Sequence, residues 1–112
     1  KIFRQIAFNM SKIKLQSEYP DLDKYKNNFG NIIYCKKDTN IYHNPYGPAF
    51  INRLYEVYYI ENKIHRLDGP AIIHSNGLKY YFIDGKKLSK EEFDVHPKRL
   101  KFLGKEYLIC LG

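Results

Sequence analysis

The segment His65-Arg66-Leu67-Asp68-Gly69-Pro70-Ala71-Ile72-Ile73 decides the fold, because the chain carries a second version of it. His43-Asn44-Pro45-Tyr46-Gly47-Pro48-Ala49-Phe50-Ile51 stands 22 positions earlier, with the His, Gly, Pro and Ala in register. The next segment repeats as well, since residues 57–63 correspond to residues 80–86 with a displacement of 23. A period of about 20 residues is typical of stacked units that are too small to bury an apolar face alone. The extra residue must lie in the turn that connects the two segments.

The residues between the two segments indicate that each unit is a β-hairpin. Asn76-Gly77 separates two apolar stretches, and this dipeptide favours a type I′ turn, which needs positive φ at both central residues. We therefore expect a hairpin over 71–83 in which Ile73 faces Tyr80. In the shorter copy the deletion predicts a less ideal three-residue loop at 53–55.

Two further turns predict that strand follows strand as an antiparallel meander. Asp84-Gly85 has the composition of a tight turn, and Glu61-Asn62 stands at the matching place in the earlier copy, with Asn tolerating left-handed backbone. Each Gly-Pro-Ala segment is interpreted as structural: Gly allows a corner, Pro starts a strand where no amide donor is needed, and Ala allows close approach. The expected fold class is mainly β.

Length and composition agree with one small β-rich domain. The chain has 112 residues, of which 44% are hydrophobic and 16% aromatic, and aromatic side chains favour strands. Neither an apolar run long enough for a membrane span nor a secretion signal is visible, so an intracellular location and no membrane span are expected. Lys, Ile, Tyr and Asn, which have AT-rich codons, are abundant, which indicates an AT-rich source genome.

The N-terminal part of the sequence lacks the repeat. Residues 1–28 are predicted to be an N-terminal extension, with an amphipathic helix over 2–10 and a short helical turn over 21–26 after Pro20. Residues 29–112 are predicted to form the single β-hairpin-repeat domain.

Within that domain the repeats are expected at about 43–64 and 65–88. Ser89 with Glu92 has the spacing of a capping box and predicts a short helix over about 90–95. Residues 99–110 are predicted to form a final hairpin around a Leu103-Gly104 turn. Terminal units of repeat proteins are usually atypical in this way.

The segments His65–Ala71 and Tyr80–Lys86, with Asn76-Gly77 between them, resemble the short β-hairpin repeats, related to MORN repeats, of large DNA viruses, phages and some bacteria. The resemblance covers roughly residues 43–93. In the first copy Asn62 replaces the usual turn Gly. The resemblance implies a non-enzymatic repeat protein with no catalytic residue and no particular ligand, and with the AT-rich composition it implies a viral source.

The His and Cys residues predict neither a metal site nor a catalytic site. Four His and two Cys show none of the spacings of zinc ligands, and no nucleophile motif accompanies His65 and Asp68. We therefore expect no enzyme activity, no metal and no cofactor. His43 and His65 share one repeat position, which predicts a hydrogen bond to a neighbouring strand or turn. Cys35 and Cys110 are interpreted as small buried hydrophobes.

The formal net charge of +7 suggests a candidate basic face, and exposed tyrosines suggest aromatic contacts. The alternative is a solvated surface of a Lys-rich protein. The aromatic candidates are Tyr58 and Tyr81. The candidate basic face comprises Lys36, Lys37, Lys86, Lys87, Lys98, Arg99, Lys101 and Lys105.

Two functions follow as hypotheses. The leading one is a protein-interaction module that binds a host or viral protein or associates with itself, because so few hairpin units leave sheet edges exposed and little core buried. The alternative is a basic, Tyr-rich nucleic-acid-binding protein, whose complex would weaken steeply with salt.

Overall fold

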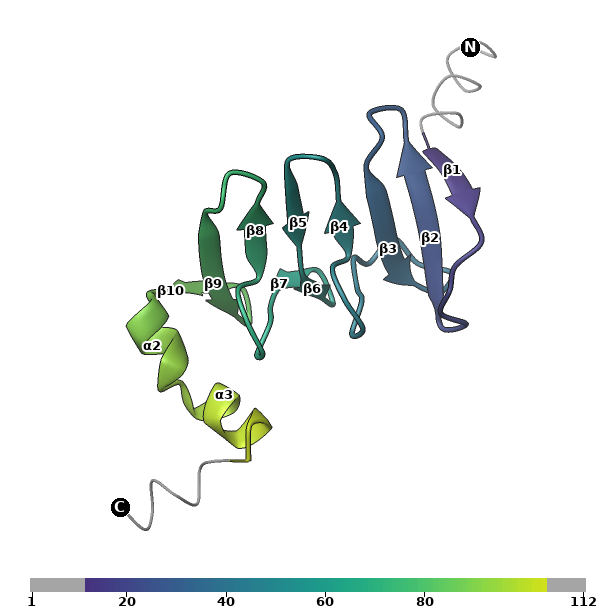
Figure 1. Ribbon diagram of the computed structural model, residues 1–112. Coiled ribbons are helices and arrows are strands. Elements are labelled where there is room, and N and C mark those ends of the chain that lie inside the picture. The colour runs from purple at the N-terminus through teal and green to yellow at the C-terminus, as the bar shows by residue number, and fades with distance from the viewer. Residues whose placement is uncertain (1–11, 105–112) are drawn as a thin grey trace.

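The computed structural model describes residues 12–104, and in this range the fold is an antiparallel meander with two short helices (Figure 1). The expectation of a mainly β fold is confirmed. The strands are β1 (Lys12–Leu15), β2 (Leu22–Asn27), β3 (Ile32–Lys36), β4 (Phe50–Ile51), β5 (Tyr55–Val57), β6 (Tyr59–Ile60), β7 (Lys63–Ile64), β8 (Ile72–His74), β9 (Lys79–Ile83) and β10 (Lys86–Leu88), and the helices are α2 (Lys90–Asp94) and α3 (Pro97–Phe102).

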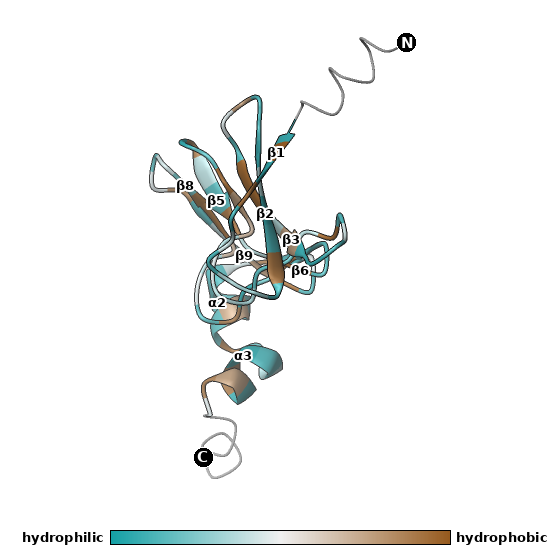
Figure 2. Cartoon of the chain, turned by 90° about the vertical axis from the view of Figure 1, so that its right-hand side faces the viewer, coloured by the Kyte–Doolittle hydropathy of each residue, from teal (hydrophilic) through white to brown (hydrophobic). Residues whose placement is uncertain are grey.

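Three long hairpins stand side by side in one sheet. Its strand order is β1-β2-β3-β4-β5-β8-β9-β10, while β6 and β7 form a separate small sheet. The tips of β2–β3, β4–β5 and β8–β9 point the same way in Figure 1 and form what we call the tip edge. The Gly-Pro-Ala loops lie at the opposite side, the loop edge. Figure 2 shows α2 and α3 beyond the loop edge, away from the tips.

Backbone hydrogen bonds between neighbouring units confirm the alignment of the two copies. Each unit donates one N–H to the next unit and accepts one in return. The same pair of bonds occurs twice, and equivalent donors and acceptors are 22 or 23 positions apart, as the repeated residues in the sequence are. The bonds, from donor to acceptor, run from Asn44 to Tyr59 and Arg66 to Phe82 in one direction and from Asn62 to Tyr42 and Gly85 to Ile64 in the other.

The structure also contains a unit that the sequence analysis missed. His43 N–H donates to the carbonyl of Tyr34 at 3.1 Å, and His65 N–H donates to the carbonyl of Tyr58 at 3.0 Å. Tyr34 therefore occupies the position of Tyr58, and the β2–β3 hairpin is the first of three units. No Gly-Pro-Ala segment precedes it, so the pattern that identified the other two was absent.

The expected helical turn over 21–26 is wrong, because β2 occupies this segment. β2 pairs antiparallel with both β1 and β3, with Tyr25 opposite Ile33. Residues 12–27 thus belong to the same sheet as the repeats, and residue 28 is not a boundary of that sheet. The apolar strand β3 offers a pairing partner that outweighs the weak helical signal of Pro20. The helix expected over 2–10 lies outside the described residues.

The turn at Asn76-Gly77 is not type I′. Gly77 has φ +95°, but Asn76 is not among the residues with positive φ. His74 N–H donates to Leu78 and Gly77 N–H donates to His74, which makes a three-residue loop of a type I turn followed by a left-handed Gly.

This loop shifts the pairing of the β8–β9 hairpin by one residue. Ile73 lies opposite Lys79, and Ile72 lies opposite Tyr80, so the expected register is wrong. The loop of the shorter copy contains two residues, since Asn52 N–H donates to Tyr55, and not the expected three. The one-residue difference between the copies does lie in this turn.

Two turns with positive φ at both central residues lie at the loop edge. Glu61 and Asn62 have φ values of 47° and 66°, and Asp84 and Gly85 have values of 52° and 81°. Positive φ at both central residues defines a type I′ turn. Both tight turns expected there are confirmed, including the one in which Asn62 replaces Gly.

The C-terminal part partly agrees with the sequence analysis. Helix α2 is confirmed, with Ser89 as N-cap and a complete capping box with Glu92. Residues 97–102 form helix α3, so the prediction that residues 99–102 form the first strand of a final hairpin over 99–110 is wrong. Pro97 occupies the first turn, and His96 caps it by accepting the N–H of Lys98. Residues 105–110 lie outside the described range.

Within residues 12–104 the core consists of small clusters and not of one large interior. Leu22, Tyr34 and Ala49 form one cluster, and Ile83, Leu88 and Phe93 form the other. Leu88 stands where the other units carry His43 and His65, and it packs against α2. The last unit is therefore closed by apolar contact. No helix within residues 12–104 is long and apolar enough to cross a membrane.

Gly77→Val should destabilise the β8–β9 hairpin. A β-branched residue is strained at φ +95°, and a Cβ there meets no atom within 4 Å, so the cost comes from the backbone alone. We expect a loss of about 1–2 kcal/mol and a fall in Tm of several degrees in thermal unfolding. Arg53→Val, in a turn without positive φ, is the control, and an equal shift for both would contradict this turn assignment.

Candidate functional site

Two histidines join the units at the loop edge. The Nδ1 atom of His43 accepts the N–H of Glu61 at 3.0 Å, and that of His65 accepts the N–H of Asp84 at 2.9 Å. Each donor is the first residue of a type I′ turn in the next unit. The expected hydrogen bond to a neighbouring turn is confirmed. The carboxylate near His65 belongs to Asp84, with Oδ1 3.4 Å from Nδ1, and not to Asp68.

These contacts require neutral imidazoles. Burial lowers the pKa of His43, and Lys36 lowers it further, while Glu61 and Asp21 act in the opposite direction. Burial likewise lowers the pKa of His65, opposed by Asp84 and assisted by Lys98. A protonated Nδ1 is a donor and no longer accepts the turn N–H.

A second pair of equivalent side chains supports the Gly-Pro-Ala loops. Asn44 Nδ2 donates to the carbonyl of Pro48, and Arg66 Nη1 donates to the carbonyl of Pro70, both at 3.0 Å. Arg66 also donates from Nε to Asp68 Oδ1 at 2.8 Å. The guanidinium lies over the ring of Tyr58, 4.1 Å from its centroid.

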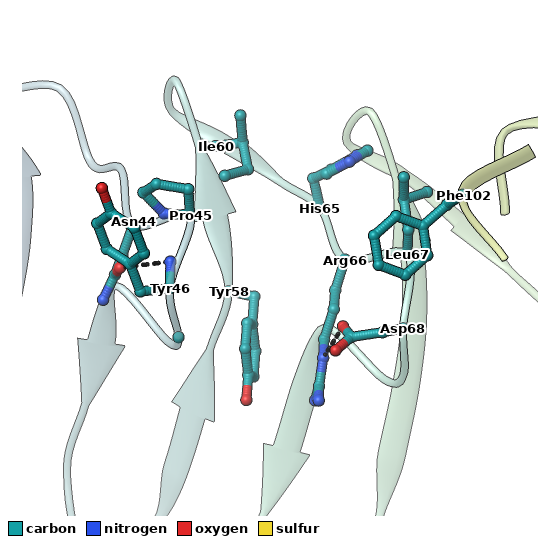
Figure 3. A pocket seen from close by; sticks show the side chains of 11 residues that line it. Asn44, Pro45, Tyr46, Tyr58, Ile60, His65, Arg66, Leu67, Asp68 and Phe102 are labelled. Carbon is teal, nitrogen blue, oxygen red and sulfur yellow. Dashed lines mark hydrogen bonds and ion pairs between the residues drawn. The ribbon is translucent and has the colours of Figure 1, made fainter.

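These loops border an open groove of about 400 Å³. Figure 3 shows its residues: one wall comes from Pro45 and Tyr46, the other from Leu67 and Asp68, and the Tyr58 and Arg66 side chains lie between them. Phe102 of α3 lies on the same side as Leu67. The remaining lining residues are Asn44, Gly47, Ile60 and His65. We call this site the groove.

The groove combines apolar surface with a fixed cation. Phe102 is 57% exposed and Tyr46 is 58% exposed, so large rings meet solvent on both sides. Arg99 of α3 donates to the carbonyl of Leu67 at 2.5 Å, which attaches the helix to the groove wall. Its walls therefore come from three parts of the chain that are fixed to one another. Such a surface can bury apolar side chains of a partner and donate hydrogen bonds from its centre.

The residues of the candidate basic face come from the first unit, the third unit and α3, and some of them contact other side chains. Lys36 forms an ion pair with Glu61 at 2.7 Å, Lys98 pairs with Asp84, and Lys87 lies over the ring of Tyr80. Arg99 donates a hydrogen bond to the carbonyl of Leu67 and lies over the ring of Phe93. Lys37 follows β3 in the first unit, Lys86 lies on β10 in the third, and Lys101 lies on α3. Lys105 is outside the described residues.

The two candidate aromatic contacts have different positions. Tyr58 lies in the groove, and burial raises the pKa of its hydroxyl. Tyr81 packs against Phe93 of α2, with ring centroids 4.7 Å apart, and so contributes to the core cluster there. Phe102 was missed as a groove residue because it lies on α3, which the sequence analysis expected as a strand, and Leu67 was missed because no local pattern shows which loop it faces.

The described residues contain no metal-binding arrangement. Between residues 12 and 104 no three His, Cys, Asp or Glu side chains gather at one point. Cys35 is 2% exposed, and burial raises the pKa of its thiol, which disfavours the reactive thiolate. Cys110 is outside this range.

Comparison of the chain with protein-family models, with curated proteins and with solved structures finds no match in any of the three.

The stability should fall in mild acid. The pKa of both histidines is lowered from 6.5 in the folded state, so the unfolded chain binds more protons below that pH. The stabilisation is complete above pH 6.5 and is lost as pH falls through the lowered values. We expect Tm to decrease between pH 7.5 and 5, above the range in which ordinary carboxyls titrate.

The double variant His43→Asn/His65→Asn is the matched control for this effect. The Asn Oδ1 accepts the same N–H at every pH. The variant should show a flatter Tm between pH 7.5 and 5 than the parent chain does. An unchanged pH slope would contradict the role of the two histidines.

Arg66→Asn should be tolerated better than Arg66→Ala. Asn44 shows that an amide at this repeat position reaches the Pro carbonyl, whereas Ala leaves that carbonyl without its donor. We expect Arg66→Ala to cost about 1 kcal/mol more than Arg66→Asn in urea unfolding. Equal losses would mean that the hydrogen bond contributes nothing at this position.

Proposed function

We propose that this chain is a non-enzymatic repeat module that binds another protein, of viral or host origin, through the groove. The observation that carries the proposal is the groove itself, whose exposed apolar walls come from two neighbouring units and α3. Monomeric proteins rarely leave large apolar side chains gathered at the surface without a binding role.

The mode of attachment supports the proposal. The histidine contacts and the Asn44 and Arg66 contacts hold the loops by hydrogen bonds on both sides of the groove. A surface that is already in its binding conformation loses less entropy on association. Tyr and Arg, which stand at its centre as Tyr58 and Arg66, are favoured at protein interfaces.

The nucleic-acid alternative lacks comparable support. The candidate basic side chains are distributed over the first and third units and α3, and two of them, Lys36 and Lys98, are paired with carboxylates. A phosphate-binding surface needs several cations that face one strand of nucleic acid. An intracellular location remains part of the proposal.

Selection from a random peptide library tests this function. The full chain should enrich peptides whose binding falls about tenfold or more in Leu67→Ser and in Phe102→Ser, because each change removes an apolar wall. Val95→Ser is the control, since Val95 is 68% exposed and does not line the groove. Absence of enriched peptides, or equal loss in the control, would contradict the proposal.

A further inference from the structure

The tip edge of the sheet carries a second recurring pattern. At each of the three hairpin tips an Asn side chain accepts the N–H of an apolar residue two positions later. The pairs are Asn27 with Phe29, Asn52 with Leu54 and Asn76 with Leu78, with distances of 3.0, 2.8 and 3.0 Å. In the β8–β9 hairpin the Asn lies two positions further along the loop, because His74 stands at the position of Asn27 and Asn52 and accepts the N–H of Asn76 at its Nδ1 atom.

These turns hold large apolar side chains in solvent. Phe29 is 87% exposed, Leu54 is 49% exposed and Leu78 is 52% exposed. The hairpins that carry them are consecutive in one sheet, so the three tips follow one another along one side of it. We call this surface the tip row. An exposed apolar residue at each of three consecutive tips, with its N–H bonded to an Asn side chain, favours a binding surface over chance exposure.

Charge is also distributed unevenly between the two edges. Near the tips the exposed cations are Lys26, Arg53 and Lys79, together with Lys12 of β1 opposite Asn27, and Glu56 on β5 is a nearby carboxylate. At the loop edge cations and carboxylates are mixed, and Glu61, Asp68 and Asp84 form ion pairs with Lys36, Arg66 and Lys98. The tip row is thus apolar and positively charged, and its partner must present apolar side chains flanked by carboxylates.

The spacing of the tips indicates the shape of that partner. Neighbouring strands lie about 4.8 Å apart, so consecutive two-stranded hairpins place their tips about 10 Å apart. Seven residues of an α-helix span about 10.5 Å, so apolar residues at heptad spacing match the row. We propose that the tip row binds an acidic amphipathic helix of another protein, whose apolar stripe lies across Phe29, Leu54 and Leu78.

This surface is separate from the groove, since it lies at the opposite edge of the sheet and shares no residue with it. Its partner binds whether or not the groove is occupied. A groove variant such as Leu67→Ser is therefore expected to leave binding at the tip row unchanged, which separates a failure here from a failure of the proposed function.

A synthetic helical peptide with Leu at heptad spacing and Glu on both flanks is the probe. It should bind the full chain in fluorescence anisotropy, and the triple variant Phe29→Ser/Leu54→Ser/Leu78→Ser should bind it about tenfold or more weakly. The control variant Val95→Ser/Leu103→Ser removes exposed apolar residues elsewhere and should bind normally. Equal weakening in both variants would overturn the proposal.

Charge reversal tests the specificity. Lys26→Glu/Arg53→Glu/Lys79→Glu should lose the Glu-flanked peptide and gain binding to the same peptide with Lys flanks. Lys86→Glu/Lys87→Glu/Lys101→Glu makes an equal change of charge away from the tips and should do neither. Binding that follows net charge alone in both variants would overturn the proposal.

Other occupants are separate outcomes of the same variants. If the Glu-flanked peptide does not bind, while vesicles of anionic lipid, single-stranded DNA or a second copy of the chain bind in a manner that depends on the three apolar tips, the acidic helix is the wrong partner. Sedimentation velocity of the chain alone distinguishes the second copy from the other two.

Discussion

The hydrogen bond from a turn N–H to the Nδ1 atom of the histidine in the preceding unit is the contact on which the stacking of the units depends. It occurs twice, at His43 and at His65, and each time it fixes the first residue of a left-handed turn. A sheet with small core clusters cannot rely on hydrophobic burial alone to set the position of one hairpin against the next. The pairing of β3 with β4 and of β5 with β8 joins the hairpins within the sheet, and the directional histidine bonds fix the units at the loop edge, so that the loops beside them have a defined place.

Much of the fold was predictable because the repeat contains residues with strong backbone requirements. His, Gly, Pro and Ala recur in register. The Glu61-Asn62 and Asp84-Gly85 turns were predictable because Asn and Gly tolerate positive φ. The prediction failed where two turn types compete for the same dipeptide. Asn76 stays out of the left-handed region because its side chain accepts the N–H of Leu78, and that local bond adds a residue to the loop. The register of the whole hairpin changed as a consequence.

The groove was less predictable than the fold, for a different reason. Its walls come from two units and from α3, and no local pattern states which loops will face each other. Arg66 and Tyr58 were visible as repeat positions, whereas Phe102 entered the groove only through the helix that Pro97 begins. The first unit was not predictable for the same reason. Tyr34 corresponds to Tyr58 because each carbonyl accepts the N–H of a repeat histidine, and no Gly-Pro-Ala segment precedes this unit. Relationships that depend on tertiary contact leave little trace in a single sequence.

Leu88 gives the stack of units a direction. A further unit placed after the third would present a turn N–H to a side chain that has no acceptor, and it would have to displace Phe93 from its apolar contact. A copy inserted between existing units would instead find a histidine before it and a donor turn after it. Lengthening by internal duplication is therefore compatible with this architecture, whereas addition at the C-terminal end is not. Homologous chains of different length should differ in the number of histidine-bearing units and keep one leucine-bearing unit at the end.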